Sequence, residues 1–232
     1  MDQFPLKYNS DDLKRYRHFD DMPQPIDGFL ENVLRLVEIN GARVLDYGCG
    51  LGRMVPQLLS LGASKVVGCD PSKDMINGAK QLLTEGKRGD ASAVSFDELT
   101  DLPLQYESDS FHGILSRFVL HYIADTSAVL AELHRVIKPG GWFVAVFSDV
   151  YFELGFEHLA NTDLPLQFTG GASARTLAKP GMEIVDNAKA VGFEIVRYEN
   201  VLNGSAATID PSYAYRDKLR LETSLLIARK KK

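Results

Sequence analysis

The chain has 232 residues, 45% of them apolar, and a formal net charge of −5 at pH 7. This length suits one α/β domain with a modest cap, and no run approaches the ~20 apolar residues that a membrane-spanning helix needs. The acidic balance argues against a nucleic-acid partner, which usually calls for a basic face. The polar, acidic stretch from Met1 to Asp12 does not resemble a signal peptide, so we expect a cytoplasmic protein.

The two cysteines, Cys49 and Cys69, are too few for a disulfide scaffold. Neither belongs to a cluster with metal-ligand spacing, so the sequence predicts no metal site. Both stand at the ends of apolar segments, where a cysteine usually serves as a small buried side chain.

Apolar periodicity predicts alternating helices and strands from residue 26 onward. The predicted strands cover residues 43–47, 65–69, 93–96, 111–116, 142–147, 193–198 and 224–229. Helices are predicted at residues 26–37, between Gly52 and Gly62, from the N-cap Ser72 to Gly86, from about Asp125 to the turn at 138–141, and at about 180–191. Two aromatic-containing segments, about 1–25 and 148–178, lack this periodicity and are predicted to form a small lid.

Strands that alternate with helices predict an α/β fold with a parallel sheet and right-handed crossovers. The last two predicted strands have no clear helix between them, which favours an antiparallel final strand. We therefore expect one domain over residues 1–232, built as a three-layer sandwich around a seven-stranded, mostly parallel sheet.

The segment from Val44 to Gly52 is the most informative part of the chain. It runs from an apolar strand into Asp-x-Gly-x-Gly-x-Gly, and glycines let a backbone approach a ligand where a Cβ would clash. The next strand ends on Asp70, and an acid in this position can accept hydrogen bonds from both hydroxyls of a ribose. The pattern predicts a nucleoside site at the carboxyl ends of two adjacent strands.

The glycine spacing separates two kinds of nucleoside ligand. The dinucleotide fingerprint G-x-G-x-x-G would place its third glycine at position 53, where this chain has Arg53. Asp46 precedes the glycines, and its carboxylate would repel a pyrophosphate while attracting a cationic ligand. A nicotinamide-dependent oxidoreductase is therefore disfavoured.

These motifs resemble those of the class I S-adenosylmethionine-dependent methyltransferases, in the branch that acts on small molecules. The block from Phe111 to Phe147, with its Lys-Pro-Gly-Gly turn, and the closing segment 225–230 also resemble this family. The resemblance implies that S-adenosyl-L-methionine contacts Asp46, Gly48, Cys49, Gly50, Asp70, Pro71, Met75, Asp97, Glu98, Leu99, Ser116 and Arg117. It implies that Asp46 favours the ammonium, that Asp70 binds the ribose and that Asp97 meets the adenine amino edge.

Candidates for the acceptor site are weaker. His121 follows the strand at 111–116 on a loop, where an acceptor can approach, and His158 lies in the expected lid. Five lid aromatics are candidate substrate contacts: Tyr16, Phe19, Tyr151, Phe152 and Phe168. The same aromatics would also serve simply to pack the lid on the domain.

The resemblance implies transfer of a methyl group from S-adenosylmethionine to oxygen or nitrogen of a small metabolite, with carbon less favoured. Residues 116–119 read Ser-Arg-Phe-Val, not the Asn-Pro-Pro-Tyr of enzymes that methylate flipped bases, so no nucleic-acid partner is expected. The alternative is a non-catalytic S-adenosylmethionine-binding partner or activator subunit of a methyltransferase, because an intact cofactor motif fits both. The acceptor and the oligomeric state do not follow from the sequence.

Overall fold

The computed structural model of the protein describes residue 17 and residues 25–150, 163–167, 173–177, 181–201 and 221–232. Most of the expected lid lies outside these ranges. So do six of the predicted site residues: Tyr16, Phe19, Tyr151, Phe152, His158 and Phe168.

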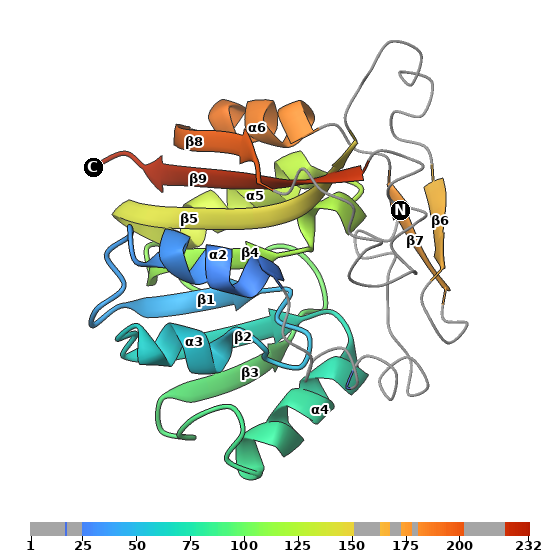
Figure 1. Cartoon of the computed structure of the whole chain (residues 1–232). Coiled ribbons are helices and arrows are strands. Elements are labelled where there is room, and N and C mark those ends of the chain that lie inside the picture. Colours follow the sequence, from blue (N-terminus) through green and yellow to red (C-terminus); the bar gives the residue numbers. More distant parts are fainter. Residues whose placement is uncertain (1–16, 18–24, 151–162, 168–172, 178–180, 202–220) are drawn as a thin grey trace.

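A seven-stranded sheet with the order β3-β2-β1-β4-β5-β9-β8 runs through the molecule (Figure 1). Its strands are β1 (Arg43–Tyr47), β2 (Lys65–Asp70), β3 (Val94–Glu98), β4 (Phe111–Arg117), β5 (Ile137–Val150), β8 (Phe193–Asn200) and β9 (Leu221–Lys230). Strands β1 to β5 pair in parallel, whereas β9 is antiparallel to both β5 and β8. The predicted mostly parallel sheet with an antiparallel last strand is confirmed.

Helices cover both faces of this sheet (Figure 1). One layer contains α2 (Pro25–Leu34), α3 (Val55–Ser60) and α4 (Lys73–Thr84), and the other contains α5 (Thr126–Val136) and α6 (Gly181–Ala190). Two N-caps fix helix starts: the Ser72 side chain accepts from the Met75 N–H at 3.3 Å, and Asp125 accepts from the Ala128 N–H at 3.0 Å. The predicted three-layer sandwich is thus present.

The core is split by the sheet into two apolar clusters. Along β1, Val44 packs with the α2–α3 layer while Leu45 and Tyr47 pack with the α5–α6 layer. Successive side chains of a strand point to opposite faces, so a sheet covered on both sides needs nearly continuous apolar strands. The strands consequently leave polar groups mainly at their ends, where the site is built.

Two features depart from the predicted elements. Strand β5 begins at Ile137 directly after α5 and extends to Val150, because it pairs with β9 from Trp142↔Arg229 to Val150↔Leu221. A separate two-stranded antiparallel sheet, β6 (Asp163–Gln167) with β7 (Ser173–Leu177), lies within the segment for which no strand was predicted. The extension of β5 depends on a strand distant in the chain, which periodicity alone does not reveal, whereas β6 and β7 are close in the chain and pair outside the main sheet.

Candidate functional site

The glycine loop, residues 48–52, connects β1 to the segment that leads into α3. The N–H groups of Gly48 and Cys49 both donate to the carbonyl oxygen of Cys69 on β2, at 2.8 and 2.9 Å. The three glycines Gly48, Gly50 and Gly52 have φ values of 76°, 53° and 75°. Residues with side chains rarely adopt this left-handed region, so the shape of the loop itself requires glycine.

Packing also requires glycine at two of these positions. A Cβ at Gly48 would lie 2.2 Å from Val119 Cγ2, and one at Gly52 would lie 2.6 Å from Phe96 Cζ. From the sequence, we expected these glycines to let a ligand approach the backbone. The structure adds that neighbouring side chains already occupy the space where a Cβ would stand.

Asp70 joins the glycine loop to the end of β2. Its Oδ2 accepts from the Gly50 N–H at 3.0 Å and its Oδ1 accepts from the Ser72 N–H at 2.9 Å. The side chain is buried, and this burial raises the pKa of the Asp70 carboxyl to about 6, against the opposing effect of the two N–H donors. Each oxygen still has acceptor capacity for a ligand hydroxyl.

Asp46 is the more isolated of the two acids. Its residue is 1% exposed, and burial raises the pKa of its carboxyl to about 7; Arg117 opposes this shift and Asp70 adds to it. Among the described residues, its buried Oδ2 has no hydrogen-bond partner. An unpartnered buried carboxylate oxygen is costly, and a cationic ligand group beside it would remove the cost. The ammonium of a methionine moiety fits this requirement.

Asp27 forms ion pairs with two arginines beside the glycine loop. Asp27, in the first turn of α2, pairs through Oδ2 with Arg53 at 2.5 Å and through Oδ1 with Arg117 at 3.0 Å. From the sequence, Arg53 was noted only as the residue in place of a third glycine, and Arg117 only as a source of backbone contacts. Asp27 was not predicted, because its partners Arg53 and Arg117 lie 26 and 90 residues away in the chain.

The end of β3 brings the predicted adenine residues beside Asp70. In the parallel register Cys69 faces Asp97 and Asp70 faces Glu98, and the Leu99 N–H donates to the Asp70 carbonyl at 3.0 Å. Leu99 is buried and Glu98 is exposed. The Asp97 side chain has a partner of its own, because the Tyr106 hydroxyl donates to Asp97 Oδ2 at 3.1 Å. Nothing in the sequence pointed to Tyr106.

Met75 lies beneath the glycine loop. It is buried in a small cluster with Leu51 of that loop and Leu82 of α4. Pro71 is half-buried between Asp70 and the cap of α4. Met75 therefore supports the loop from the α4 side, and its contact with adenine stays a prediction.

Cys49 and Ser116 are both buried. Burial raises the pKa of the Cys49 thiol well above its usual value, which keeps the sulfur protonated and unreactive. Ser116 is fully buried on β4, and among the described residues its hydroxyl oxygen has no hydrogen-bond partner. Both residues stand at the carboxyl ends of neighbouring strands, as predicted.

His121 is located in η1 (Leu120–Tyr122), just beyond β4. The ring is buried, and Nδ1 accepts from the Ser148 N–H of β5 at 3.3 Å. When the imidazole is neutral, this bond places its proton on Nε2. Its contact with an acceptor stays a prediction.

Within the described ranges, no three or more His, Cys, Asp or Glu side chains are grouped in a way that suits a metal ion. The helices of those ranges are all too short or too polar to cross a bilayer.

Solved structures share this architecture. The crystal structure of an S-adenosylmethionine-dependent methyltransferase from Mesorhizobium loti superposes with a TM-score of 0.64 at 22% identity, covering 87% of this chain and 96% of the other. The crystal structure of the [4+2]-cyclase SpnF superposes with a TM-score of 0.68 at 19% identity, covering 87% and 80%. At these identities, the comparison establishes the fold.

Sequence comparison adds the family. The family model described as "Methyltransferase domain" matches residues 45–145, which span the glycine loop, Asp70 and Asp97. Methyltransferase phqN of Penicillium fellutanum is 28% identical over 165 residues, 69% of this chain and 48% of that protein. Residues 45–145 of the chain are therefore similar to a methyltransferase domain.

Two further relatives differ in the acceptor atom that their names indicate. The ubiquinone biosynthesis O-methyltransferase of Mesorhizobium japonicum is 34% identical over 117 residues, 50% of this chain and 45% of that protein. The 24-methylenesterol C-methyltransferase 2 of Arabidopsis thaliana is 28% identical over 181 residues, 76% of this chain and 48% of that protein. The chain matches about half the length of these curated relatives.

Proposed function

We propose that the protein transfers a methyl group from S-adenosyl-L-methionine to an oxygen or nitrogen, less favourably a carbon, of a small metabolite. The observation that carries this proposal is the pair of buried acids at the glycine loop. Asp70 is held by the Gly50 and Ser72 N–H groups, whereas Asp46 Oδ2 is buried without a partner among the described residues. This arrangement suits a nucleoside that carries a cationic amino acid.

Each residue of the candidate site is proposed to bind a different part of the cofactor. Asp46 attracts the ammonium, the glycine loop admits the methionine chain, Asp70 accepts from the ribose hydroxyls, and Asp97 accepts from the adenine amino group. The bound cofactor would supply a methyl group already activated on a sulfonium. The protein's contribution is therefore to position this donor and to exclude water from it.

The acceptor is proposed to enter beyond β4, where His121 lies at the strand end. We propose that His121 contacts the acceptor there, because it lies just beyond the end of β4. The predicted role of the segments about 1–25 and 148–178 as a lid that supplies the acceptor pocket belongs to the same proposal. The names of relatives include both O- and C-methyltransferases, so the atom is part of what must be tested.

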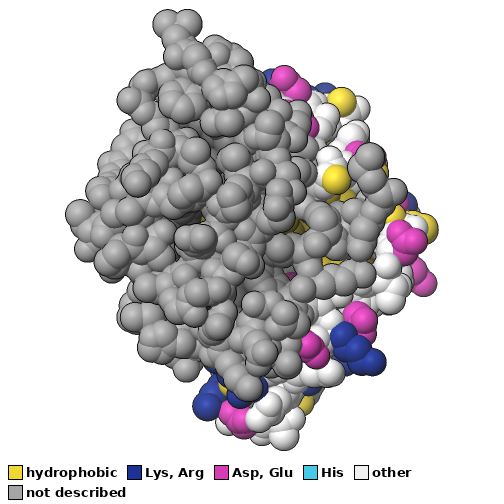
Figure 2. All heavy atoms as spheres, turned by 90° about the vertical axis from the view of Figure 1, so that its right-hand side faces the viewer, with side chains coloured by type: hydrophobic (Ala, Val, Ile, Leu, Met, Phe, Trp, Pro, Cys, Tyr) yellow, Lys and Arg dark blue, Asp and Glu magenta, His cyan; other side chains and the backbone are white. Residues whose placement is uncertain are grey.

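The charge balance of the chain favours a small acceptor over a nucleic acid. Figure 2 views the face toward which β1 to β5 run, and the described side chains along its margin carry both signs of charge with apolar groups between them. The net charge of −5 points the same way, since nucleic-acid binding usually uses a continuous basic surface.

The first experiment is calorimetry with S-adenosylhomocysteine and with NAD. We expect S-adenosylhomocysteine to bind and NAD not to bind, because Arg53 stands where a dinucleotide site needs glycine. Binding of NAD with no binding of S-adenosylhomocysteine would overturn the proposal.

The second experiment separates catalysis from binding alone. A non-catalytic cofactor-binding subunit is the alternative function, because an intact cofactor motif fits both. Incubation with S-adenosylmethionine and a fractionated metabolite pool should release S-adenosylhomocysteine if the protein is an enzyme. Tight cofactor binding with no release from any fraction, alone or with partner proteins added, would support the alternative.

A further inference from the structure

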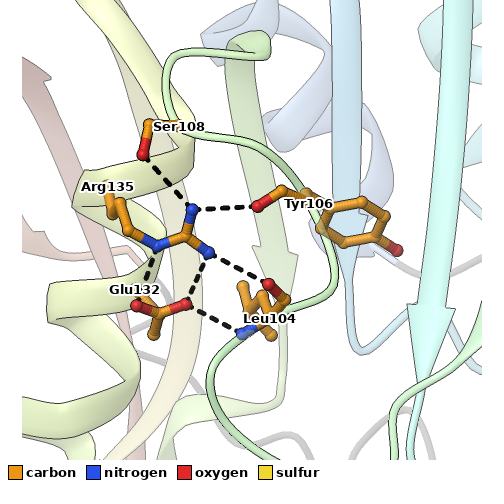
Figure 3. Close-up of polar contacts among 5 residues, drawn as sticks. All are labelled: Leu104, Tyr106, Ser108, Glu132 and Arg135. Carbon is orange, nitrogen blue, oxygen red and sulfur yellow. Dashed lines mark hydrogen bonds and ion pairs between the residues drawn. The ribbon is translucent and has the colours of Figure 1, made fainter.

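Two side chains of α5 clamp the loop between β3 and β4. Arg135 binds both carboxylate oxygens of Glu132, through Nε at 2.9 Å and Nη2 at 2.7 Å. The same guanidinium donates to the carbonyl oxygens of Leu104 at 3.0 Å and Tyr106 at 2.9 Å, and Glu132 accepts from the Leu104 N–H at 2.8 Å (Figure 3). A bidentate, planar pair of this kind fixes geometry as well as contributing energy. The backbone of the loop is held at two residues.

The clamp leaves the Tyr106 side chain directed away from α5. In Figure 3 its ring points away from the guanidinium that binds its carbonyl. The ring packs edge-on against Phe111, with centroids 5.1 Å apart, and its hydroxyl reaches Asp97 Oδ2 at 3.1 Å. Burial and the nearby Cys69 and Asp97 raise the pKa of the hydroxyl, so Tyr106 remains a donor. One residue thus connects the clamp to the end of β3.

We propose that Tyr106, fixed by the Arg135–Glu132 clamp, is a positioning residue that orients Asp97 to recognise the 6-amino group of an adenine ring. The proposal rests on the proposed function, since it assumes that the nucleoside end of the cofactor lies at Asp97.

The chemistry of the carboxylate explains why an orienting hydroxyl matters. An ionised carboxylate only accepts hydrogen bonds, so it favours a 6-amino group, which donates, over a 6-oxo group, which also accepts. The Tyr106 hydroxyl occupies Oδ2 and so directs the acceptor capacity of Oδ1 toward a ligand. Without that hydroxyl the carboxylate can rotate, and the distinction between amino and oxo should weaken.

The test measures selectivity by calorimetry, with S-adenosylhomocysteine and S-inosylhomocysteine as probes. These ligands differ at position 6 of the purine, amino against oxo, and consequently at N1, which accepts in adenine and carries a proton in hypoxanthine. We expect the wild-type protein to prefer the adenine ligand, and Tyr106→Phe to lower this preference about three- to tenfold, the effect expected of one hydrogen bond. The phenyl ring keeps its packing on Phe111, so the melting temperature should change little. Tyr198→Phe, on β8 at the opposite edge of the sheet, is the matched control.

Arg135→Lys tests the clamp, because lysine keeps the charge but loses the planar fork. It should lower the preference in the same direction as Tyr106→Phe, and the double variant should add little, as expected of residues acting in series. A lower melting temperature with an unchanged preference would make the clamp merely structural and overturn its part of the inference.

The outcomes separate this inference from the proposed function. If the wild-type protein binds neither probe, the proposed function fails. If it binds both equally, or if Tyr106→Phe keeps the full preference, the function stands and the inference is overturned. Asp97→Asn should abolish most of the preference, and a preference unaffected by that change would also overturn the inference.

Discussion

The glycine loop follows β1 and the clamped loop follows β3, and the two loops are held in different ways. The glycine loop is fixed by its own backbone, through left-handed glycines and N–H groups that donate to Cys69 and Asp70. The loop between β3 and β4 is fixed by side chains of α5, namely Arg135 and Glu132. A region that depends on backbone geometry tolerates almost no substitution, whereas one that depends on a side-chain network can be adjusted an atom at a time.

The largest effect is expected for a substitution in the glycine loop. Gly48→Ala should lower the free energy of unfolding by about 2–5 kcal/mol, combining roughly 1–2 for the left-handed residue and about 1–3 for the clash with Val119. Denaturation in urea measures the change. Adding Val119→Ala should restore the part caused by the clash, with Val119→Ala alone as the reference. A loss below 1 kcal/mol in Gly48→Ala would contradict this account of the loop.

The next effect concerns binding at the same loop. Asp70→Ala should weaken binding of S-adenosylhomocysteine by about 1.5–3 kcal/mol, because the ribose loses a charge-assisted hydrogen-bond acceptor and the Gly50 N–H loses its partner. Calorimetry measures the affinity, and Asp186→Ala on the exposed side of α6 is the control. Unchanged affinity in Asp70→Ala would remove this acid from the site.

The two buried acids should also make binding depend on pH. Both pKa values are raised, to about 7 for Asp46 and about 6 for Asp70, so both groups are largely protonated at pH 5. Because the ligand favours the ionised forms, affinity for S-adenosylhomocysteine should rise from pH 5 to pH 8, by up to about tenfold per unit for each group. Calorimetry at several pH values measures the slope, and Asp46→Asn should make it shallower. A flat profile would contradict the assignment.

The stability of the ligand-free protein should change in the opposite direction. Between about pH 4 and pH 7 the unfolded carboxyls of Asp46 and Asp70 ionise while the folded ones retain their protons. The folded state then binds more protons than the unfolded state, so the contribution of these two groups to stability falls as pH rises. Melting curves of wild type and Asp46→Asn across this range isolate the contribution of Asp46.

The smallest expected effect concerns the ion pairs of Asp27. Asp27→Asn should cost about 1 kcal/mol of unfolding free energy or less, since its pairs with Arg53 and Arg117 are partly exposed to water. The loss should shrink at high salt, because ions screen such pairs. Urea denaturation at low and high ionic strength compares the two, and a loss that does not depend on salt would point to packing instead.

Much of the fold followed from the sequence because it depends on local patterns. The strands at Val44 and Val66, the caps at Ser72 and Asp125 and the order of the elements are all recorded in short stretches of chain. The full length of β5 was missed because it depends on β9, which is distant in the chain. The β6–β7 pair was missed although its strands are close in the chain, since a proline such as Pro165 within a short segment argues against a strand.

The candidate site, like the fold, has parts that local sequence predicts and parts that depend on distant contacts. The sequence by itself determined where the candidate site lies and predicted its type of ligand, because Asp46, Gly48, Gly50 and Asp70 lie at or just after the ends of two adjacent strands. Only the tertiary structure decided which side chains hold that site in shape. Asp27 meets Arg117 across 90 residues, and Arg135 meets Tyr106 across 29. No local periodicity records such contacts, because they exist only once the helices have packed against the sheet.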